Sequence, residues 1–328
     1  MDTVRFGVIG AGQIVRRQHA PAFAEASNAS ITGIASRNPT KATEAAEAVG
    51  VERAYGSYDE LLADPAIDAV LIALPMKAHA EWIVKAARAG KHVLCEKPMV
   101  LTVAEADAVI EAAQATGVLV MEGFTHLFPA QIAYVRDLLA SGRLGAIRAI
   151  RAEVLYPTLD WENDTRAMPE HGACVLIEAG CYCTLAIQHF MGDAPLAVHG
   201  FAASRPGCDF ETSFVGIMSF PGERLGYMCT TMESPFRACC EIITTAGRIE
   251  MPELFTGTRL VVHATGEKPE EVTFEPVNRF TLQAEHFADC VLHGRAPIVS
   301  LEQSRQNIQT LLALREAGRA SAAPLAKG

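Results

Sequence analysis

The first dozen residues constrain the fold of this chain more than any other stretch. An apolar run, Val4–Ile9, ends in Gly10-Ala11-Gly12. A buried strand that breaks at closely spaced glycines and enters a helix is the opening of a Rossmann unit. The glycines let the backbone turn sharply and approach a pyrophosphate, and the helix N-terminus supplies N–H groups and a partial positive charge. The third glycine position of this fingerprint is Val15, so we expect looser packing of helix on strand; an ordinary strand and turn is the alternative interpretation.

Strands and helices alternate over the first third of the chain. Ala69–Leu74 is a continuous apolar run, as expected of a strand covered on both faces. Asn38 and Pro39 supply an N-cap and a helix-starting proline for the segment that follows. This alternation predicts a parallel sheet with right-handed crossovers. We expect strands at Val4–Ile9, Ser30–Ala35, Ala69–Leu74, His92–Cys95 and Val118–Met121, and helices at Ile14–Ala26, Thr40–Val49, Ala78–Ala89 and Val103–Thr116.

The pattern changes after Gly123. From Leu196 to Glu275 the chain is strand-rich, with hairpin signals at Phe220–Glu223 and Thr245–Arg248. Such strands predict a mainly antiparallel sheet with one face on helices and the other available for association. We expect a long strand at Ala146–Leu155 and helices at Ala130–Ala140, Val175–Phe190, Leu282–Leu292 and Leu301–Ala317.

The predicted fold class is therefore α/β, with two domains. Residues 1–122 form an N-terminal Rossmann domain that binds NAD(P). We expect residues 123–328 to form a C-terminal α/β domain with a large, mainly antiparallel open sheet. Its closing helices can pack back on the first domain.

Composition excludes several classes of protein. Half of the 328 residues are hydrophobic, but they fall in short runs, and no run reaches the roughly 18 residues of a membrane span. The N-terminus enters a strand directly, which argues against a secretory signal and predicts a cytoplasmic protein. Nine cysteines without C-x-x-C pairing suggest free thiols and no metal site. A net charge of -10 disfavours nucleic acid and anionic membranes as partners.

The end of the second expected strand indicates which dinucleotide is bound. Ser36 and Arg37 stand where an acidic residue would hold the ribose of NAD, and Lys41 follows one helical turn later. A hydroxyl followed by a guanidinium suits a 2′-phosphate, because Arg offers bidentate donors and a permanent charge. The sequence therefore predicts NADP(H) in preference to NAD(H). A solvated loop arginine is the alternative.

A lysine follows another strand of the expected parallel sheet. Lys97 lies between Glu96 and Pro98, and the proline holds it in an extended conformation. Ligands of open parallel sheets bind outside the carboxyl ends of the strands, so this lysine is placed to face a substrate oxygen. The alternative interpretation is that Lys97 is a surface lysine in a loop between a strand and a helix.

The second half of the chain carries a carboxylate and a phenol at helical spacing. Glu178 and Tyr182 are four residues apart and would share one face of a helix, with His171 shortly upstream. The alternative interpretation is that Tyr182 is a core tyrosine and Glu178 a buried or helix-capping acid.

Taken together, these motifs resemble the Gfo/Idh/MocA family of oxidoreductases, in the family's order along nearly the whole chain. The Glu-Lys-Pro motif is highly specific in this setting. The matching segments are Gly7-x-x-Gly10-x-Gly12, Pro75 with His79-Ala80-Glu81, Gly90 to Pro98, Glu122-Gly123-Phe124, Gly142 to Arg148, Glu178-x-Gly180-x-Tyr182 and Glu285 to Asp289. The resemblance implies a Rossmann domain, a second domain with a large open sheet, a tightly bound nicotinamide cofactor, and dimers or tetramers formed through that sheet.

The tyrosine-bearing branch of the family, with its xylose and dihydrodiol dehydrogenases and its sugar-ketone reductases, is the most similar. The resemblance implies Lys97 and Tyr182 as the catalytic pair for hydride and proton transfer at a carbinol or carbonyl of a sugar, keto-sugar or cyclic diol. Residues expected at the cofactor are Gly10, Gly12, Gln13, Ile14, Ser36, Arg37, Lys41, Leu74, Pro75, His79, Glu96 and Lys97; those expected at the substrate are Lys97, Tyr156, Arg166, Glu178 and Tyr182.

Three departures from the family pattern bear on the substrate. Glu178 replaces the usual aspartate, the segment His171-Gly172-Ala173-Cys174 replaces a glycine-rich lead-in, and Met76 replaces a frequent asparagine. Two other functions remain open: a cofactor-binding regulatory or scaffold protein without turnover, and an NAD-dependent glycosidase. Neither the substrate nor the direction of the reaction follows from the sequence.

Overall fold

The computed structural model describes residues 3–162, 164–168 and 174–320, which divide into two units. The first unit ends at Thr125 and also contains Asn278–Arg305. The second runs from His126 to Val277 and resumes at Gln306. The boundary expected after residue 122 thus lies three residues early, and residues 278–305 group with the Rossmann unit rather than with the C-terminal one.

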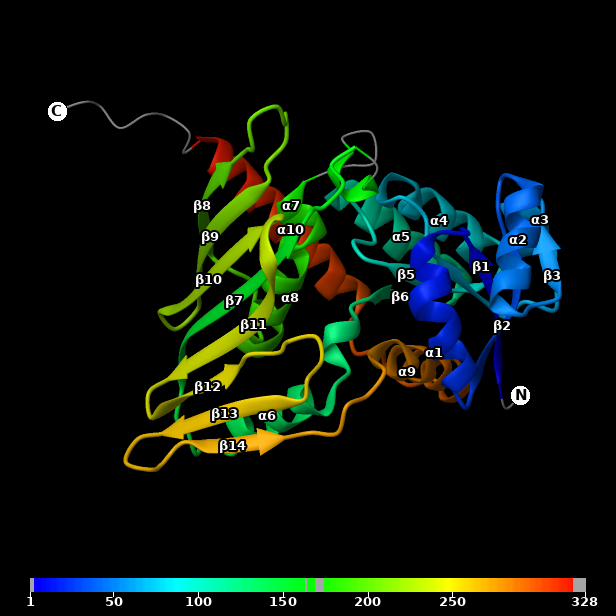
Figure 1. The fold of residues 1–328 in the computed structure, drawn as a ribbon. Helices are drawn as coiled ribbons and strands as arrows, with labels where there is room; N and C mark the ends of the chain where they lie inside the picture. Colours follow the sequence, from blue (N-terminus) through cyan, green and yellow to red (C-terminus); the bar gives the residue numbers. More distant parts are fainter. Residues whose placement is uncertain (1–2, 163, 169–173, 321–328) are drawn as a thin grey trace. The chain divides into compact units, whose positions relative to one another are not determined.

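The first unit contains a six-stranded sheet in which every neighbouring pair is parallel. Its order is β3-β2-β1-β4-β5-β6, the doubly wound order of dinucleotide-binding folds. Its strands span β1 Val4–Ile9, β2 Ala29–Ala35, β3 Arg53–Tyr55, β4 Ala69–Ile72, β5 His92–Glu96 and β6 Val120–Gly123, and Figure 1 labels all of them except β4. All residues of β4 are buried, as its apolar run predicts.

Most helices of the first unit begin and end at the expected signals. Asn38 caps α2 by accepting a hydrogen bond from the Lys41 amide, and α5 opens with a capping box between Thr102 and Glu105. The helices are α1 Ala20–Glu25, α2 Pro39–Val49, α3 Tyr58–Ala63, α4 His79–Arg88, α5 Val103–Thr116 and α9 Arg279–His293, with short 3-10 turns at Met76–Ala78 and Thr125–Leu127. Neither β3 nor α3 was expected from the sequence, because both are short and weakly patterned.

The first helix differs from the expected Ile14–Ala26. It begins at Gln13, passes through a π-helix at Val15–His19, and continues as α1. Val15 is fully buried where the strict fingerprint has a small residue. Such π turns are frequent at functional sites.

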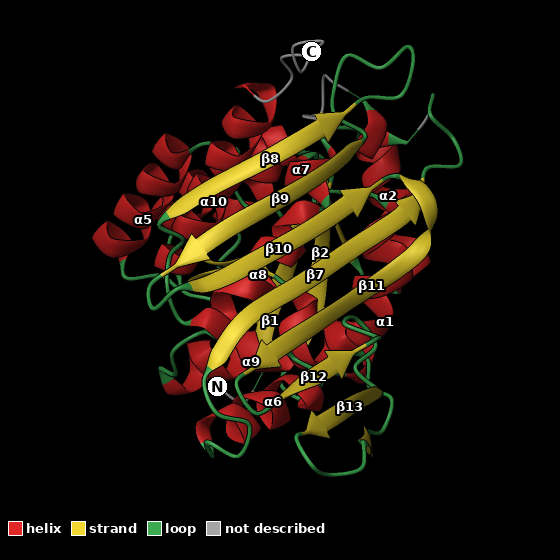
Figure 2. Ribbon diagram, turned by 90° about the vertical axis from the view of Figure 1, so that its left-hand side faces the viewer, coloured by secondary structure: helices red, strands yellow, loops and turns green. Residues whose placement is uncertain are grey.

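The second unit is built on an eight-stranded sheet with the order β14-β13-β12-β11-β7-β10-β9-β8. Only the β7–β10 pair is parallel, so the sheet is mainly antiparallel, as expected. The strands are β7 Ile147–Pro157, β8 Ala197–Ala203, β9 Ser213–Phe220, β10 Arg224–Thr231, β11 Glu233–Thr244, β12 Gly247–Met251, β13 Arg259–Ala264 and β14 Glu270–Thr273. Figure 2 shows this sheet face-on, with α7 and α8 of the same unit behind it.

The helix expected at Val175–Phe190 is two helices, α7 Val175–Glu178 and α8 Gly180–Met191. Ala179 lies between them, and its φ of -112° departs from helical geometry. Glu178 and Tyr182 therefore do not share one continuous helix, which corrects the premise of their common face. The remaining helices are α6 Ala130–Ala140, α10 Leu301–Ala320, and a 3-10 turn at Thr165–Ala167.

Two further properties concern the described residues alone. No helix among them is long and apolar enough to cross a membrane. Within the same residues, no group of three His, Cys, Asp or Glu side chains is arranged to hold a metal ion. All nine cysteines are free thiols.

Candidate active site

The glycine turn after β1 leaves no room for a side chain at one position and ample room at the other. Gly10 has a φ of +117°, and a Cβ there would lie 2.4 Å from the carbonyl oxygen of Ala73. At Gly12 a Cβ would meet no described atom of the chain within 4 Å. Gly10 thus serves the turn itself, whereas Gly12 leaves open space against the backbone where a pyrophosphate can approach. The neighbouring Gln13 and Ile14 are exposed.

The turn after β2 brings Ser36, Arg37 and Lys41 together at the start of α2. The Ser36 hydroxyl is buried and accepts a hydrogen bond of 3.3 Å from the Asn38 amide. The Arg37 and Lys41 side chains are exposed. A hydroxyl, two cations and a helix N-terminus at one turn suit a phosphate group.

The loop that carries Lys97 is held by a buried histidine from the first helix. His19 Nε2 lies 2.6 Å from Glu96 Oε1, and Glu96 Oε2 accepts a hydrogen bond of 3.3 Å from the Lys97 amide. Burial raises the pKa of Glu96, but the His19 hydrogen bond and the nearby positive charge of Lys97 outweigh it, so the pKa lies below its ordinary value. Sequence reasoning missed His19, because its partner is 77 residues away.

A second buried histidine, His79, fixes the same loop from the other side. Its Nδ1 lies 2.8 Å from the Pro98 carbonyl oxygen, and its Nε2 lies 2.8 Å from that of Leu74. Burial lowers the pKa of this imidazole. The predicted cofactor residue His79 therefore has both ring nitrogens directed at the protein backbone, where it ties the end of β4 and the adjacent Pro75 to the Lys97 loop.

Glu122 on β6 has a buried carboxyl and was not among the site residues predicted from the sequence. Its Oε1 accepts a hydrogen bond of 2.8 Å from the Met99 amide. Burial raises its pKa to about 7, against the opposing effect of the positive charge on Lys97. The motif Glu122-Gly123-Phe124 carried the only sequence signal for it.

In the second unit, Tyr182 lies within a group of aromatic rings. Its centroid is 5.2 Å from that of His126 and 4.8 Å from that of Phe255, both with edge-on geometry. His126 is fully buried, whereas Phe236 extends the group toward solvent, 6.1 Å from Phe255. None of the three neighbours was predicted, since they come from three segments far apart in sequence.

The other expected substrate residues of this unit form a second group. The Arg166 guanidinium lies 4.7 Å from the Tyr156 ring centroid and forms hydrogen bonds to both carboxylate oxygens of Asp164. The hydrogen bonds to Asp164 raise the pKa of Arg166, and the negative charge of the buried Glu178 acts in the same direction. The structure thus brings Tyr156, Arg166 and Glu178 together. His171 and its glycine-containing segment lie outside the described residues.

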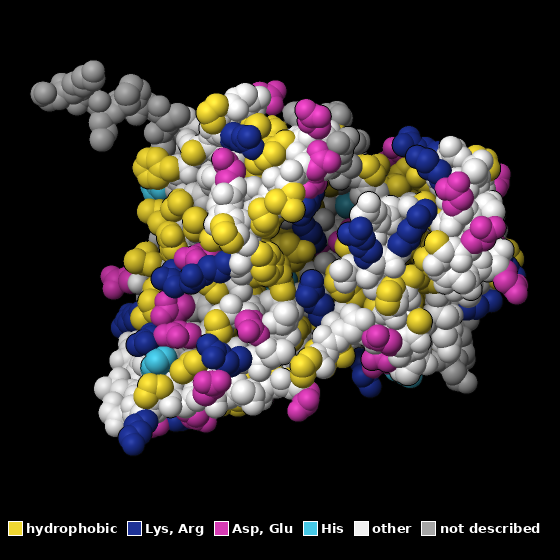
Figure 3. All heavy atoms as spheres, viewed as in Figure 1, with side chains coloured by type: hydrophobic (Ala, Val, Ile, Leu, Met, Phe, Trp, Pro, Cys, Tyr) yellow, Lys and Arg dark blue, Asp and Glu magenta, His cyan; other side chains and the backbone are white. Residues whose placement is uncertain are grey.

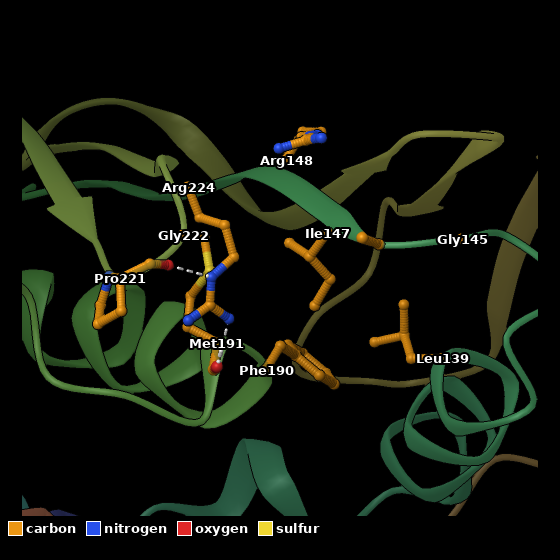
Figure 4. A pocket seen from close by; sticks show the side chains of 10 residues that line it. Leu139, Gly145, Ile147, Arg148, Phe190, Met191, Pro221, Gly222 and Arg224 are labelled. Carbon is orange, nitrogen blue, oxygen red and sulfur yellow. Dashed lines mark hydrogen bonds between the residues drawn. The ribbon is translucent and has the colours of Figure 1, made fainter.

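A separate cavity of about 590 Å³ lies in the second unit between the β9–β10 turn and the start of β7. Figure 4 shows the Arg224 guanidinium directed at the carbonyl oxygens of Pro221 and Met191, at 2.7 and 2.8 Å, and it also pairs with Asp193. Because these protein groups already occupy the guanidinium, the cavity offers an anionic ligand little beyond the exposed Arg148.

Comparison with known proteins decides the family. Residues 4–124 match the NAD-binding Rossmann-fold domain of the Gfo/Idh/MocA oxidoreductases, and residues 132–250 match the C-terminal domain of the same family. The chain belongs to the Gfo/Idh/MocA family. The resemblance inferred from the motifs and the two-part α/β fold are thereby confirmed.

Several Gfo/Idh/MocA proteins are similar along most of the chain. A D-xylose 1-dehydrogenase (NADP(+)) from Haloferax volcanii is 31% identical over 97% of this chain and 98% of its own length. A trans-1,2-dihydrobenzene-1,2-diol dehydrogenase from Xenopus laevis is 30% identical over 84% of this chain and 85% of its own. The crystal structure of a 3-ketoreductase from Actinomadura kijaniata with NADP and TDP-benzene superimposes with a TM-score of 0.88 at 29% identity, covering 96% of this chain and 98% of that one.

Proposed function

We propose that this protein is an NADP(H)-dependent oxidoreductase that transfers a hydride between nicotinamide and a carbinol or carbonyl carbon of a sugar, keto-sugar or cyclic diol. The observation that carries the proposal is the open backbone at Gly12 beside the tight turn at Gly10, which fits a pyrophosphate. The relatives named as dehydrogenases and reductases of sugars and diols support the same reaction class.

NADP(H) is favoured over NAD(H) by the residues after β2. Ser36, Arg37 and Lys41 offer donors and positive charge where NAD-binding proteins place a carboxylate. The bound nicotinamide supplies or accepts the hydride. The remaining steps fall to the side chains of this chain.

Tyr182 and Lys97 form the proton-transfer pair in this proposal. During reduction the Tyr182 hydroxyl donates its proton to the carbonyl oxygen, and during oxidation the phenolate takes the proton back. A phenol has a pKa near 10, so a cationic lysine beside it is needed to favour the phenolate at neutral pH. Glu96, His19 and His79 hold the Lys97 backbone for this role.

The substrate is held by the group around Arg166. Its Nη1, which takes no part in the hydrogen bonds to Asp164, donates to hydroxyl or carbonyl oxygens. Glu178 accepts from hydroxyls, and the Tyr156 ring supports an apolar ring face. Glu178 is one methylene longer than the aspartate usual in the family, so we expect a substrate preference different from that of its relatives.

Replacement of Tyr182 by Phe tests this function directly. Tyr182→Phe should lower turnover at least ~100-fold and leave NADP(H) affinity nearly unchanged, because only the proton donor is removed. Tyr134→Phe, on α6 with its ring against Phe274, is the matched control and should retain activity. Wild-type turnover in Tyr182→Phe would remove this residue from the mechanism.

The same assay separates the two alternatives. A scaffold protein would bind the dinucleotide and turn over no sugar or diol, whereas a glycosidase would cleave glycosides without net change in the absorbance of reduced cofactor. The similarity to named dehydrogenases and reductases favours net oxidation or reduction.

We further propose that the outer face of the eight-stranded sheet pairs with a second copy of the chain. Ile217 and Leu225 on this sheet are 52% and 58% exposed and border a groove of about 510 Å³ that also contains Tyr227 and Ile243. In Figure 3 this face is turned to the left, and hydrophobic side chains are visible along that side of the second unit. Beside them, Arg237 pairs with Glu153 across two strands. A surface with both an apolar groove and charges of both signs can be self-complementary across a two-fold axis.

A further inference from the structure

We propose that Asn307 of α10 is a positioning residue for Tyr182. The inference rests on the proposed function, in which Tyr182 transfers the proton, and it concerns how the second unit holds that residue in place. Asn307 does not reach the reacting atoms in this proposal. It acts on the turn of α8 that carries the phenol.

The first turn of α8 begins directly after a break in the helix. Ala179 departs from helical geometry, and α8 starts at Gly180, two residues before Tyr182. The first amides of a helix lack partners within it, so the first turn is the part of a helix that is least fixed by its own hydrogen bonds. A catalytic residue in such a turn needs support from elsewhere.

Asn307 supplies that support on both sides of Tyr182 in the sequence. Its Nδ2 donates a hydrogen bond of 3.2 Å to the carbonyl oxygen of Cys181. Its Oδ1 accepts a hydrogen bond of 2.6 Å from the Thr184 hydroxyl. One side chain thus forms hydrogen bonds with the residue before Tyr182 and with the residue two positions after it.

The two hydrogen bonds of Asn307 are buried, and further polar side chains extend from them along α8 and α10. Thr184 is fully buried and Asn307 is 3% exposed, which makes each of their hydrogen bonds costly to lose. Gln188 donates to Asn307 Oδ1 at 3.2 Å, and Thr310 contacts Gln188 at 3.5 Å. These four side chains are all buried and form a polar cluster between α8 and α10.

The ring of Tyr182 is held separately, by His126 and by Phe255. The loop that carries Phe255 is fixed in turn by Gln131, whose Nε2 donates to the carbonyl oxygens of Glu253 and Leu254 at 3.1 and 3.3 Å. The aromatic contacts restrict the ring, whereas Asn307 restricts the backbone. Loss of Asn307 should therefore move the phenol oxygen while the Tyr182 ring keeps its contacts with His126 and Phe255.

Two substitutions at Asn307 and one control test the proposal. Asn307→Ala removes the hydrogen bonds to both Cys181 and Thr184, while Asn307→Asp keeps an acceptor for Thr184 and loses the donor to Cys181. Both should lower kcat by ~10-fold or more and leave NADP(H) affinity unchanged, because small misplacements of a reacting group cost large factors in rate. Thr310→Val removes a buried hydroxyl farther along α10 and should leave kcat within about twofold.

A spectroscopic measurement separates positioning from stability. The chain has six tyrosines, and the ¹³Cζ signal of Tyr182 is the one lost in Tyr182→Phe. That signal should shift or broaden in both Asn307 variants and stay in place in Thr310→Val, in samples that thermal unfolding shows to be folded at the assay temperature. An unchanged Tyr182 signal with wild-type kcat in both Asn307 variants would overturn the proposal, as would an equal effect of Thr310→Val. Full activity of Tyr182→Phe would instead defeat the proposed function, and the Tyr182 signal would still report whether Asn307 positions that residue.

Discussion

The two sheets of this chain bury their side chains in different ways, and each exposes a different feature for recognition. In the parallel sheet, all four residues of β4 are buried, so its faces are covered and only the carboxyl ends of its strands are available. In the antiparallel sheet, β7 alternates between buried residues such as Ile150 and Ala152 and the more exposed Ala149 and Arg151. The first sheet therefore leaves only the edge formed by the carboxyl ends of its strands open to ligands, and the second offers a whole face.

This difference locates the two kinds of binding in the proposed function. In that proposal the cofactor binds where strands of the first sheet end, at Gly10, Ser36 and Lys97. The broad outer surface of the second sheet is suited to another protein surface, since a flat face offers area rather than depth. Changes at the edge should alter cofactor binding, and changes on the face should alter assembly.

The largest effect is expected at the edge, from Gly10→Ala. A Cβ at Gly10 would lie 2.4 Å from backbone oxygen and would impose a φ of +117° on alanine, so the turn must move. We expect NADP(H) affinity to fall at least ~100-fold and the unfolding free energy to fall by about 1–3 kcal/mol. Fluorescence titration with NADPH and urea unfolding measure the two effects.

Gly12→Ala is the matched control for the turn. Its Cβ meets no described atom of the chain, so stability should stay near wild type while cofactor affinity falls, because the added methyl occupies the approach of the pyrophosphate. Equal NADPH binding in Gly12→Ala and wild type would show that this edge does not receive the dinucleotide.

The next effect is expected on the face, from Ile217→Lys. A lysine in an apolar contact loses hydration without gaining a partner, so the dissociation constant of the assembly should rise by ~100-fold or more while the monomer stays folded. Analytical ultracentrifugation over a concentration series measures it. Leu159→Lys, at an exposed position beyond the end of β7 and outside the groove, should leave assembly unchanged. A monomeric wild-type protein would contradict the proposed pairing.

A smaller effect at the edge is expected from Arg37→Ala. Removal of the guanidinium should weaken NADPH binding by ~10- to 100-fold and NADH binding much less, because only NADPH carries the 2′-phosphate. Parallel titrations with both dinucleotides measure the ratio. A uniform loss would show that Arg37 does not contact that phosphate.

The smallest effect concerns the covered interior of the first sheet. Glu122 has a folded pKa of about 7 against an ordinary value of 4.5. Between these values the folded protein binds a proton that the unfolded chain has lost, so this group's contribution to the unfolding free energy is complete below pH 4.5 and is lost as pH rises through 7.

Glu122→Gln should remove that dependence, by an amount on the order of 1–3 kcal/mol. Urea unfolding of wild type and variant at acidic and mildly alkaline pH measures the difference. The same pH slope in both proteins would show that the Glu122 carboxyl is not the buried proton site.

Local signals explain why much of the fold could be predicted. The helix Val103–Thr116 was predicted with its observed bounds, and its ends are fixed locally by the Thr102 cap and by Gly117, since such caps act within one turn. The strand Val4–Ile9 was likewise predicted in full from its apolar run. By contrast, the break at Ala179 was not predicted. No proline lies there, and Gly180, which follows it, is a buried helical residue. The packing of α7 and α8 against the sheet decides where the helix breaks.

The sequence by itself determined the chemistry-bearing ends of the strands and the residue types placed there, because turn glycines, caps and apolar periodicity act over a few residues. Only the tertiary structure decided what holds those residues in place. His19 reaches Glu96 from 77 positions away, and Asn307 reaches Thr184 from 123. Such contacts depend on how elements distant in the chain pack together, and no local pattern in a single sequence encodes that distance.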